Sequence, residues 1–231
     1  MKRIGILGGL GPQATMDLEQ RIHSLSQRLI PAAQNGGYPP MIVYYHRHAP
    51  VLLDHYAQPV IPFQPDPRML EAAKMLGALS DFIIIPSNGV HMFQQEIERA
   101  SGKSVLSMVD LVVEEVKKKQ WRKVGVLGFK TAMVYANKLK AIGIQYETID
   151  ATLQLKMDKS IERVMEGRDD HGDRMVMREV VAALRSKNVD GIIPGCTELP
   201  FLLREEINSK GMVNPIALLA DAAVRVSIDG E

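Results

Sequence analysis

Short runs of apolar residues recur along the chain, and each run ends in glycine or in a small polar residue. Residues 3–9 (RIGILGG) are similar to residues 123–129 (KVGVLGF), and residues 81–87 (DFIIIPS) are similar to residues 190–196 (DGIIPGC). A short apolar run bounded by glycine is typical of a parallel strand buried on both faces. The two kinds of strand occur twice in the same order, which indicates a duplicated α/β unit. The alternative is a chance match, because buried strands share a small set of residue types.

The segments between these runs carry apolar residues at intervals of three and four, which is the period of an amphipathic helix. The helices predicted in this way span residues 13–29, 67–79, 109–119, 160–166, 174–186 and 216–226. Further strands are predicted at 41–45, 104–106 and 145–149, and loops at 32–40 and 167–173. Strands that alternate with helices predict an α/β fold with two similar domains, each a parallel sheet flanked by helices. We expect one domain to comprise residues 1–102 plus 212–231, and the other residues 103–211.

The composition of the chain limits the classes of partner that the protein is expected to bind. The chain of 231 residues has 28 Lys and Arg against 27 Asp and Glu, and aromatic residues are 5% of the total. No basic stripe or base-stacking platform is therefore expected, which argues against nucleic acid. No apolar run reaches the length of a membrane span. The single cysteine, Cys196, rules out an internal disulfide and a zinc site with several cysteines, so we expect a cytoplasmic protein.

A glycine-rich turn, Gly8-Gly9-Leu10-Gly11-Pro12, follows the first predicted strand and leads into a helix. Backbone N–H groups at such a helix start can hold an anion. The spacing is not that of the dinucleotide-binding fingerprint, and no acidic residue follows at the end of a second strand. A plain tight turn explains the glycines equally well.

Two further segments, residues 86–91 (PSNGVH) and 195–200 (GCTELP), each follow a predicted strand. Ligands of open α/β sheets bind beyond the carboxyl ends of the strands, so Ser87 and Cys196 are candidates for one shared crevice. A lone cysteine is most often a small buried apolar residue. The neighbours of Cys196 favour a functional role instead, because Gly195 permits close approach and a helix N-terminus can lower a thiol pKa.

These three segments together resemble the aspartate/glutamate (hydantoin) racemase superfamily. The resemblance covers nearly the whole chain, with the motifs in the right order and spacing, and GCTELP is the most specific of them. It implies two pseudo-twofold-related α/β domains with the active site in the crevice between them. It also implies a homodimer that acts on a small carboxylate such as an amino acid, without pyridoxal phosphate or any other cofactor.

The resemblance further implies a mechanism in which two thiols face each other across the substrate Cα, one as thiolate base and one as thiol acid. Cys196 matches the second thiol, and Ser87 stands at the position of the first. Glu198 would orient or tune Cys196. The residues expected to hold the substrate carboxylate or the enediolate-like charge are Gly9, Leu10, Gly11, Pro12, Asn88, Gly89, Val90, Thr197 and Glu198.

The chain departs from the family pattern in the first half. The hydroxyl of Ser87 is far less acidic than a thiol, so it is a poor carbanion base without an activating neighbour, although it can donate a proton or hold a water. His91 could assist Ser87, but a local structural role is favoured. Gly89 and Val90 replace the usual Thr-Ala of the family, which removes a hydroxyl from the expected substrate site.

Two basic residues that the family's aspartate-specific members use for the distal carboxylate are also missing. Their positions fall near Leu52 and Met165. Arg47 could supply a substitute charge from a different position. His46, His48 and His55 crowd the same loop, but no carboxylate is spaced to join them, so a solvated loop is favoured over a metal site.

Three interpretations remain at this stage. The chain is a racemase in which Cys196 serves one face of the substrate and Ser87 or water serves the other. Alternatively, it is a single-cysteine decarboxylase of a malonate-type acid, which needs only one proton donor. The third interpretation is a catalytically silent relative that binds a small carboxylate, because a fold does not fix a function.

Overall fold

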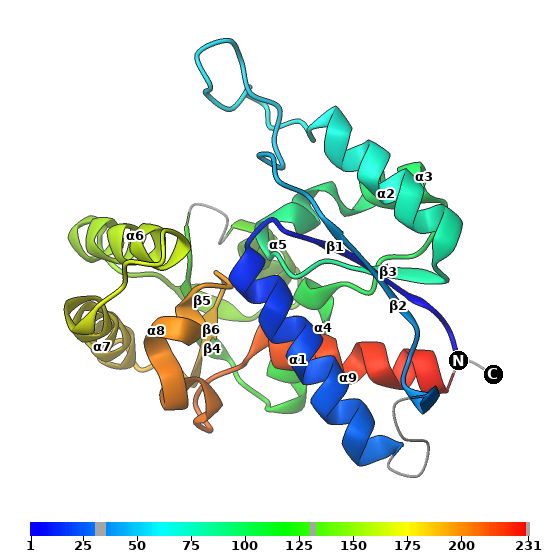
Figure 1. Cartoon of the computed structure of the whole chain (residues 1–231). Helices are drawn as coiled ribbons and strands as arrows, with labels where there is room; N and C mark the ends of the chain where they lie inside the picture. The colour runs from blue at the N-terminus through cyan, green and yellow to red at the C-terminus, as the bar shows by residue number, and fades with distance from the viewer. Residues whose placement is uncertain (31–35, 130–132, 230–231) are drawn as a thin grey trace. The chain divides into compact units, whose positions relative to one another are not determined.

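The computed structural model describes residues 1–30, 36–129 and 133–229. The chain divides into two compact units, one formed by Met1–Met108 with Ile216–Glu231 and the other by Val109–Pro215 (Figure 1). None of the described helices is both long enough and apolar enough to cross a bilayer.

The first unit contains a three-stranded parallel sheet in the order β2-β1-β3. The strands are β1 (Ile4–Gly8), β2 (Met41–Tyr45) and β3 (Phe82–Ile84), and Ile4 of the central strand lies opposite both Met41 and Phe82. β1 is buried along its whole length, as expected of a parallel strand covered on both faces. Figure 1 shows helices on both sides of this sheet; they are α1 (Pro12–Leu29), α2 (Pro67–Leu79), α3 (Gln94–Ser101) and α9 (Pro215–Ile228).

The second unit repeats this arrangement in the order β5-β4-β6. Its strands are β4 (Lys123–Leu127), β5 (Gln145–Glu147) and β6 (Gly191–Pro194), all parallel. The helices are α4 (Met108–Lys118), α5 (Met133–Ala141), α6 (Ala151–Met165), α7 (His171–Arg185) and α8 (Leu199–Leu203). Apolar residues of α6, α7 and α8 form one core with Leu127 and Ile192 of the sheet.

The two sheets agree beyond strand order. In each, the strand that occurs first in the chain is central, the second pairs on one side and the third on the other. Each outer third strand also carries one additional parallel bridge, Ile83 to Val105 and Ile192 to Met212. A chance likeness between strand sequences does not account for a repeated topology, so this agreement supports the duplication inferred from the sequence.

Several predicted bounds are wrong, and the α6–α7 junction shows why. The helix expected at 160–166 begins at Ala151, where Asp150 accepts hydrogen bonds from the N–H groups of Thr152 and Leu153. The loop expected at 167–173 ends earlier, because Asp170 and Asp173 form a capping box that starts α7 at His171. Cap residues of this kind set a helix start more firmly than apolar spacing does.

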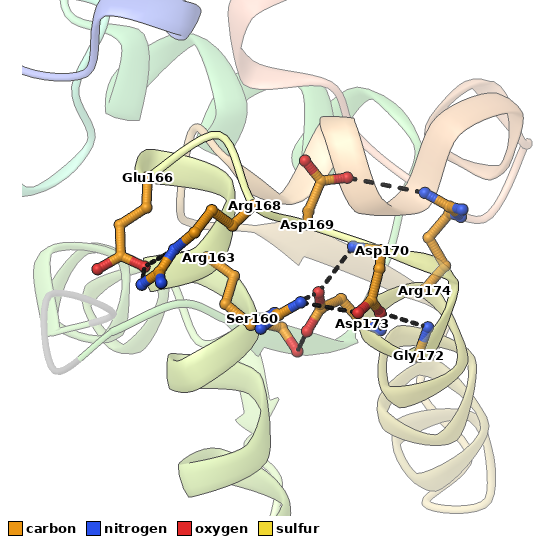
Figure 2. Close-up of polar contacts among 9 residues, drawn as sticks. All are labelled: Ser160, Arg163, Glu166, Arg168, Asp169, Asp170, Gly172, Asp173 and Arg174. Atoms are coloured by element: carbon orange, nitrogen blue, oxygen red, sulfur yellow. Dashed lines mark hydrogen bonds and ion pairs between the residues drawn. The ribbon is translucent and has the colours of Figure 1, made fainter.

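The same junction is held by a polar network (Figure 2). Asp173 accepts hydrogen bonds from Ser160 at 3.0 Å and from Nε of Arg163 at 2.9 Å. Burial alone would raise the pKa of Asp173, but the hydrogen bonds from Arg163, the Asp170 N–H and Ser160 outweigh it and lower the pKa. The network therefore ties α6 to α7 with an ionised carboxylate.

Other differences concern short elements. The strand expected at 104–106 is reduced to the single bridge at Val105, and the strand expected at 145–149 ends at Glu147. Helices α3 and α5 were not predicted from the apolar spacing. Residues 32–35 of the loop expected at 32–40 lie outside the described residues. Residues 36–40 contain neither strand nor α-helix.

Candidate active site

In the first unit, the glycine-rich turn joins β1 to α1 at the carboxyl end of the sheet. Gly9 has φ +76°, and a Cβ there would lie 2.7 Å from both the His46 nitrogen and the Tyr45 Cα. The Gly9 N–H donates to Thr15 Oγ1 at 2.9 Å, and that hydroxyl donates to the Gly11 carbonyl at 3.2 Å. The Thr15 hydroxyl thus links Gly9 to Gly11 and stabilises the turn.

Helix α1 starts at this turn without a side-chain cap. Gly11 is the N-cap residue, and Pro12 follows in the first turn of the helix. The N–H groups of a helix start attract anions when no side chain competes for them. The segment Gly9–Pro12 therefore has the backbone geometry for binding a carboxylate.

Ser87 and His91 lie just after β3, at the same edge of the sheet. His91 Nδ1 contacts the Ser87 carbonyl oxygen at 2.8 Å, and the Met108 N–H donates to His91 Nε2 at 3.1 Å. Because Nε2 must accept, Nδ1 carries the proton and donates to the carbonyl. Both ring nitrogens are thus engaged with backbone groups, so His91 holds the loop and the start of α4 rather than activating Ser87.

The Ser87 side chain is partly buried, and its hydroxyl has no hydrogen-bond partner within the described part of the chain. Asn88 is buried and precedes the 3-10 turn Gly89–Phe93, in which Val90 is buried and Gly89 is half-buried. Ser87 and Asn88 therefore follow the same strand end, where the sequence places them.

In the second unit, Cys196 follows β6. Its Sγ donates to Glu198 Oε2 at 3.0 Å, and Thr197 Oγ1 donates to the same oxygen at 3.2 Å. Thr197 and Glu198 are buried, whereas Cys196 is partly exposed. The thiol is thus accessible on one side and held by a carboxylate on the other.

This arrangement corrects the sequence-based view of the thiol. Burial raises the pKa of Cys196 well above its ordinary value, and the charge of Glu198 and its hydrogen bond act in the same direction. The short helix α8 that follows does not overcome them. In this structure Cys196 is therefore a neutral thiol at neutral pH, suited to donate a proton, and it becomes a base only after losing that proton.

Two residues that sequence analysis missed support this loop. A Cβ on Gly128 would lie 3.1 Å from the Gly195 carbonyl group, so Gly128 packs against the peptide before Cys196. Gln154 Nε2 donates to the Gly128 carbonyl at 3.0 Å and to Asp158 Oδ1 at 2.7 Å. Asp158 also contributes to the raised pKa of Cys196. Gln154 and Asp158 are four residues apart on α6 and so lie on one face of that helix. Their spacing was not recognised because the first half of α6 was not predicted as a helix.

Of the basic and imidazole residues after β2, His46 and His48 lie together, with their ring centroids 5.5 Å apart. Arg47 is exposed and stacks over the Tyr45 ring at 5.1 Å. His46 is buried, and burial lowers its pKa, with the neighbouring His48 acting the same way. Among the described residues, no three His, Cys, Asp or Glu side chains are grouped so that they could hold a metal ion.

The fold and the site together define an α/β protein of the Asp/Glu/hydantoin racemase family, and the chain belongs to that family, whose profile matches residues 7–223. The chain is 24% identical over 229 residues to the broad specificity amino-acid racemase RacX of Bacillus subtilis strain 168, covering 96% of each protein. Membership of this family supports a racemase, and therefore an isomerase.

Solved structures share the fold. The aspartate racemase of Picrophilus torridus superimposes with a TM-score of 0.76 at 21% identity, over 98% of this chain and 94% of that chain. An aspartate racemase homologue from Pyrococcus horikoshii OT3 superimposes with a TM-score of 0.75 at 22% identity, over 99% and 100% of the two chains. The two-unit α/β architecture is therefore that of the family.

Substitution of Gly9 by alanine is expected to destabilise the protein more than substitution of Gly102, although both have positive φ. Gly102 has φ +66° with nothing within 4 Å of a Cβ, so Gly102→Ala measures backbone strain alone, about 1 kcal/mol. Gly9→Ala adds a clash with the Tyr45–His46 backbone. Urea unfolding of both variants checks this, and equal losses would contradict the proposed close approach.

The Cys196 thiol is expected to ionise only above its ordinary pKa, and Glu198→Gln is expected to lower its pKa because the negative charge that opposes the thiolate is removed. Since the chain has one cysteine, thiolate absorbance measured against Cys196→Ala reports this group alone. The exposed Glu162→Gln serves as the control and should leave the titration unchanged. A thiol that ionises below neutral pH in the wild type would refute the described environment.

Proposed function

We propose that this chain is a cofactor-independent amino-acid racemase in which Cys196 exchanges the Cα proton on one face of the substrate. The observation that carries the proposal is the Cys196–Glu198 contact of 3.0 Å at the end of β6, in a chain that belongs to a racemase family. A carboxylate within hydrogen-bond distance of a thiol forms a proton-transfer pair.

On the Cys196 face, the thiol proton first passes to Glu198 Oε2, which leaves a thiolate. The thiolate then removes the Cα proton, and the electron pair of the C–H bond moves into the substrate carboxylate as an enediolate-like charge. In the reverse direction the neutral thiol donates its proton to Cα. The raised pKa of Cys196 keeps the thiol protonated at neutral pH, so the proton donor for this second step is present without a prior proton transfer.

On the other face, Ser87 or a water that it holds returns the proton. The Ser87 hydroxyl has no side-chain partner to activate it, since His91 is engaged with backbone groups. A water is therefore the better proton carrier, with Ser87 Oγ as its anchor. Exchange of the Cα proton with solvent should then be slow on the Ser87 face and faster on the Cys196 face.

The developing negative charge needs donors that are fixed before the reaction. In the proposal these are the N–H groups of Leu10 and Gly11 in the turn Gly9–Pro12, the Asn88–Val90 segment and Thr197, since Pro12 has no N–H and the Gly9 N–H donates to Thr15. The rest of the proposal follows the family resemblance: a homodimer in the cytoplasm, with an amino acid or related carboxylate as substrate and without pyridoxal phosphate. Arg47 stays a candidate for a distal group of the substrate.

A decarboxylase of a malonate-type acid is the second candidate, because a neutral thiol is the single proton donor that this reaction needs. The C–C bond to the leaving carboxylate breaks, and the thiol protonates the resulting enediolate. The carboxylates of Glu198 and Asp158 near Cys196 favour the amino acid instead, since they would repel a dianion and attract an ammonium group. Binding without turnover is the outcome if neither reaction occurs.

Cα-proton exchange in deuterium oxide, followed by proton NMR, is expected for one enantiomer of an amino acid and to depend on Cys196. The panel comprises both enantiomers of aspartate and glutamate and several neutral amino acids. Cys196→Ala should abolish exchange while keeping the unfolding midpoint, because Sγ is the group that removes the Cα proton on that face. Exchange that persists in Cys196→Ala would refute the role of Cys196. No exchange with any amino acid would favour the malonate-type acid or a silent binding protein.

Ser87→Cys is expected to raise racemisation by about tenfold or more, because a thiol is a far better proton carrier for a carbanion than an alcohol. The measurement is polarimetry from each enantiomer in turn. Ser107→Cys, a buried serine elsewhere in the first unit, controls for the added thiol. If Ser87→Cys gains nothing while Cys196-dependent exchange persists, position 87 does not face the substrate.

A further inference from the structure

A cleft of about 280 Å³ lies in the second unit where α7 meets α8 and the 3-10 turn Arg204–Asn208. Arg174, Arg178 and Arg204 line it, two from α7 and one from the end of α8. Its apolar lining is formed by the buried side chains of Met177, Leu202 and Leu203. Three arginines thus line one hollow with an apolar wall.

The positive charges of this cleft are poorly neutralised within the protein. Arg174 has only a loose ion pair with Asp169, at 3.7 Å. Arg178 contacts the Met175 sulfur, and neither Arg178 nor Arg204 forms an ion pair with any described residue. Arg174 and Arg178 are also four apart on one helix, a spacing at which like charges repel.

Two glutamates share the lining, and one of them is already engaged. Glu206 binds Arg185 at 2.8 Å, outside the set of lining residues. Glu205 is exposed and forms no ion pair with a described residue. Arg178 and Arg204, which form no ion pair with a described residue, and the loosely paired Arg174 outnumber the one available carboxylate, so the lining has a surplus of positive charge that a bound anion would satisfy.

The backbone conformation at Arg204 is strained. Its φ of 49° and ψ of −121° lie in a region where glycine is relaxed and a residue with a Cβ is strained. Strain of this kind persists where the position has a task, typically in a ligand site. A glycine at the end of α8 would avoid this strain. The presence of an arginine instead indicates a role for its side chain.

We propose that this cleft binds a small polyanion, with Arg174, Arg178 and Arg204 holding its clustered carboxylate or phosphate oxygens. Guanidinium groups suit such oxygens because each presents several N–H donors in a plane. The cleft volume of about 280 Å³ limits the ligand to a compact molecule. The site is separate from Cys196 but close to it in sequence, since α8 starts three residues after Cys196 and ends at Leu203, immediately before Arg204.

Isothermal titration calorimetry with sodium pyrophosphate and with citrate tests the proposal on the full chain. We expect one site that weakens as salt rises, and a loss of about tenfold or more in affinity for Arg178→Gln combined with Arg204→Gln. Arg99→Gln, an exposed arginine of α3 in the first unit, should bind as the wild type does. The tighter of the two anions identifies a phosphate or a carboxylate ligand. Absence of binding by both, or equal binding by the double variant, would overturn the proposal.

Arg204→Gly separates the ligand role from a structural one. Glycine relieves the backbone strain, so we expect the Tm to rise by about 2–4 °C while anion binding is weakened. Arg204→Ala keeps the strain and loses the guanidinium, so it should lose binding without the gain in Tm. Wild-type anion affinity in Arg204→Gly would show that the side chain has no part in binding and would refute the assignment.

Discussion

Each candidate catalytic loop depends on close contact between the backbones at the end of a central parallel strand. β1 and β4 are central, and the chain leaving each packs directly against a neighbouring strand's loop, through Gly9 against Tyr45–His46 and through Gly128 against Gly195. A side chain at either glycine would move the loop that carries the chemistry. The repeated topology therefore supplies the sheets, and within each unit the glycine lets the loops at adjacent strand ends pack closely.

The electrostatics of the second unit follow from this contact. The Cys196 loop packs against Gly128, and Cys196 is only partly exposed and has two acidic side chains nearby, Glu198 and Asp158. Desolvation and negative charge both favour the neutral thiol. The first unit shows the opposite arrangement, with an unactivated hydroxyl and backbone donors at its strand ends. In the proposed mechanism, the loop in the second unit supplies the proton donor and the loops in the first unit supply the groups that bind the substrate carboxylate.

Much of the fold could be predicted because parallel strands buried on both faces leave an unmistakable apolar run, as at β1 and β4. The bounds of α6 and α7 could not be obtained from apolar spacing, because Asp150 and the Asp170–Asp173 box determine where those helices start. The positions of Ser87, Cys196 and Glu198 after their strands were also predictable. The direction of the thiol pKa was not, because it depends on desolvation and on Asp158, which only the folded chain brings near Cys196.

Membership of the family does not decide between the two proposed reactions. The protonation state of the Cys196 thiol limits which of them the chain can carry out. A two-base racemase needs a thiolate on one face and a thiol on the other, but this chain has one thiol, which is held neutral. In its resting state the thiol can therefore protonate a carbanion directly, whereas generating one requires that the thiol first be ionised. A racemase built this way needs the substrate to lower the cost of ionising Cys196. The ammonium group of an amino acid can do so, because it brings a positive charge to a site that otherwise holds Glu198 and Asp158. A malonate-type acid cannot. The same two carboxylates that suppress the thiolate in the empty site thus favour the class of substrate that would restore it.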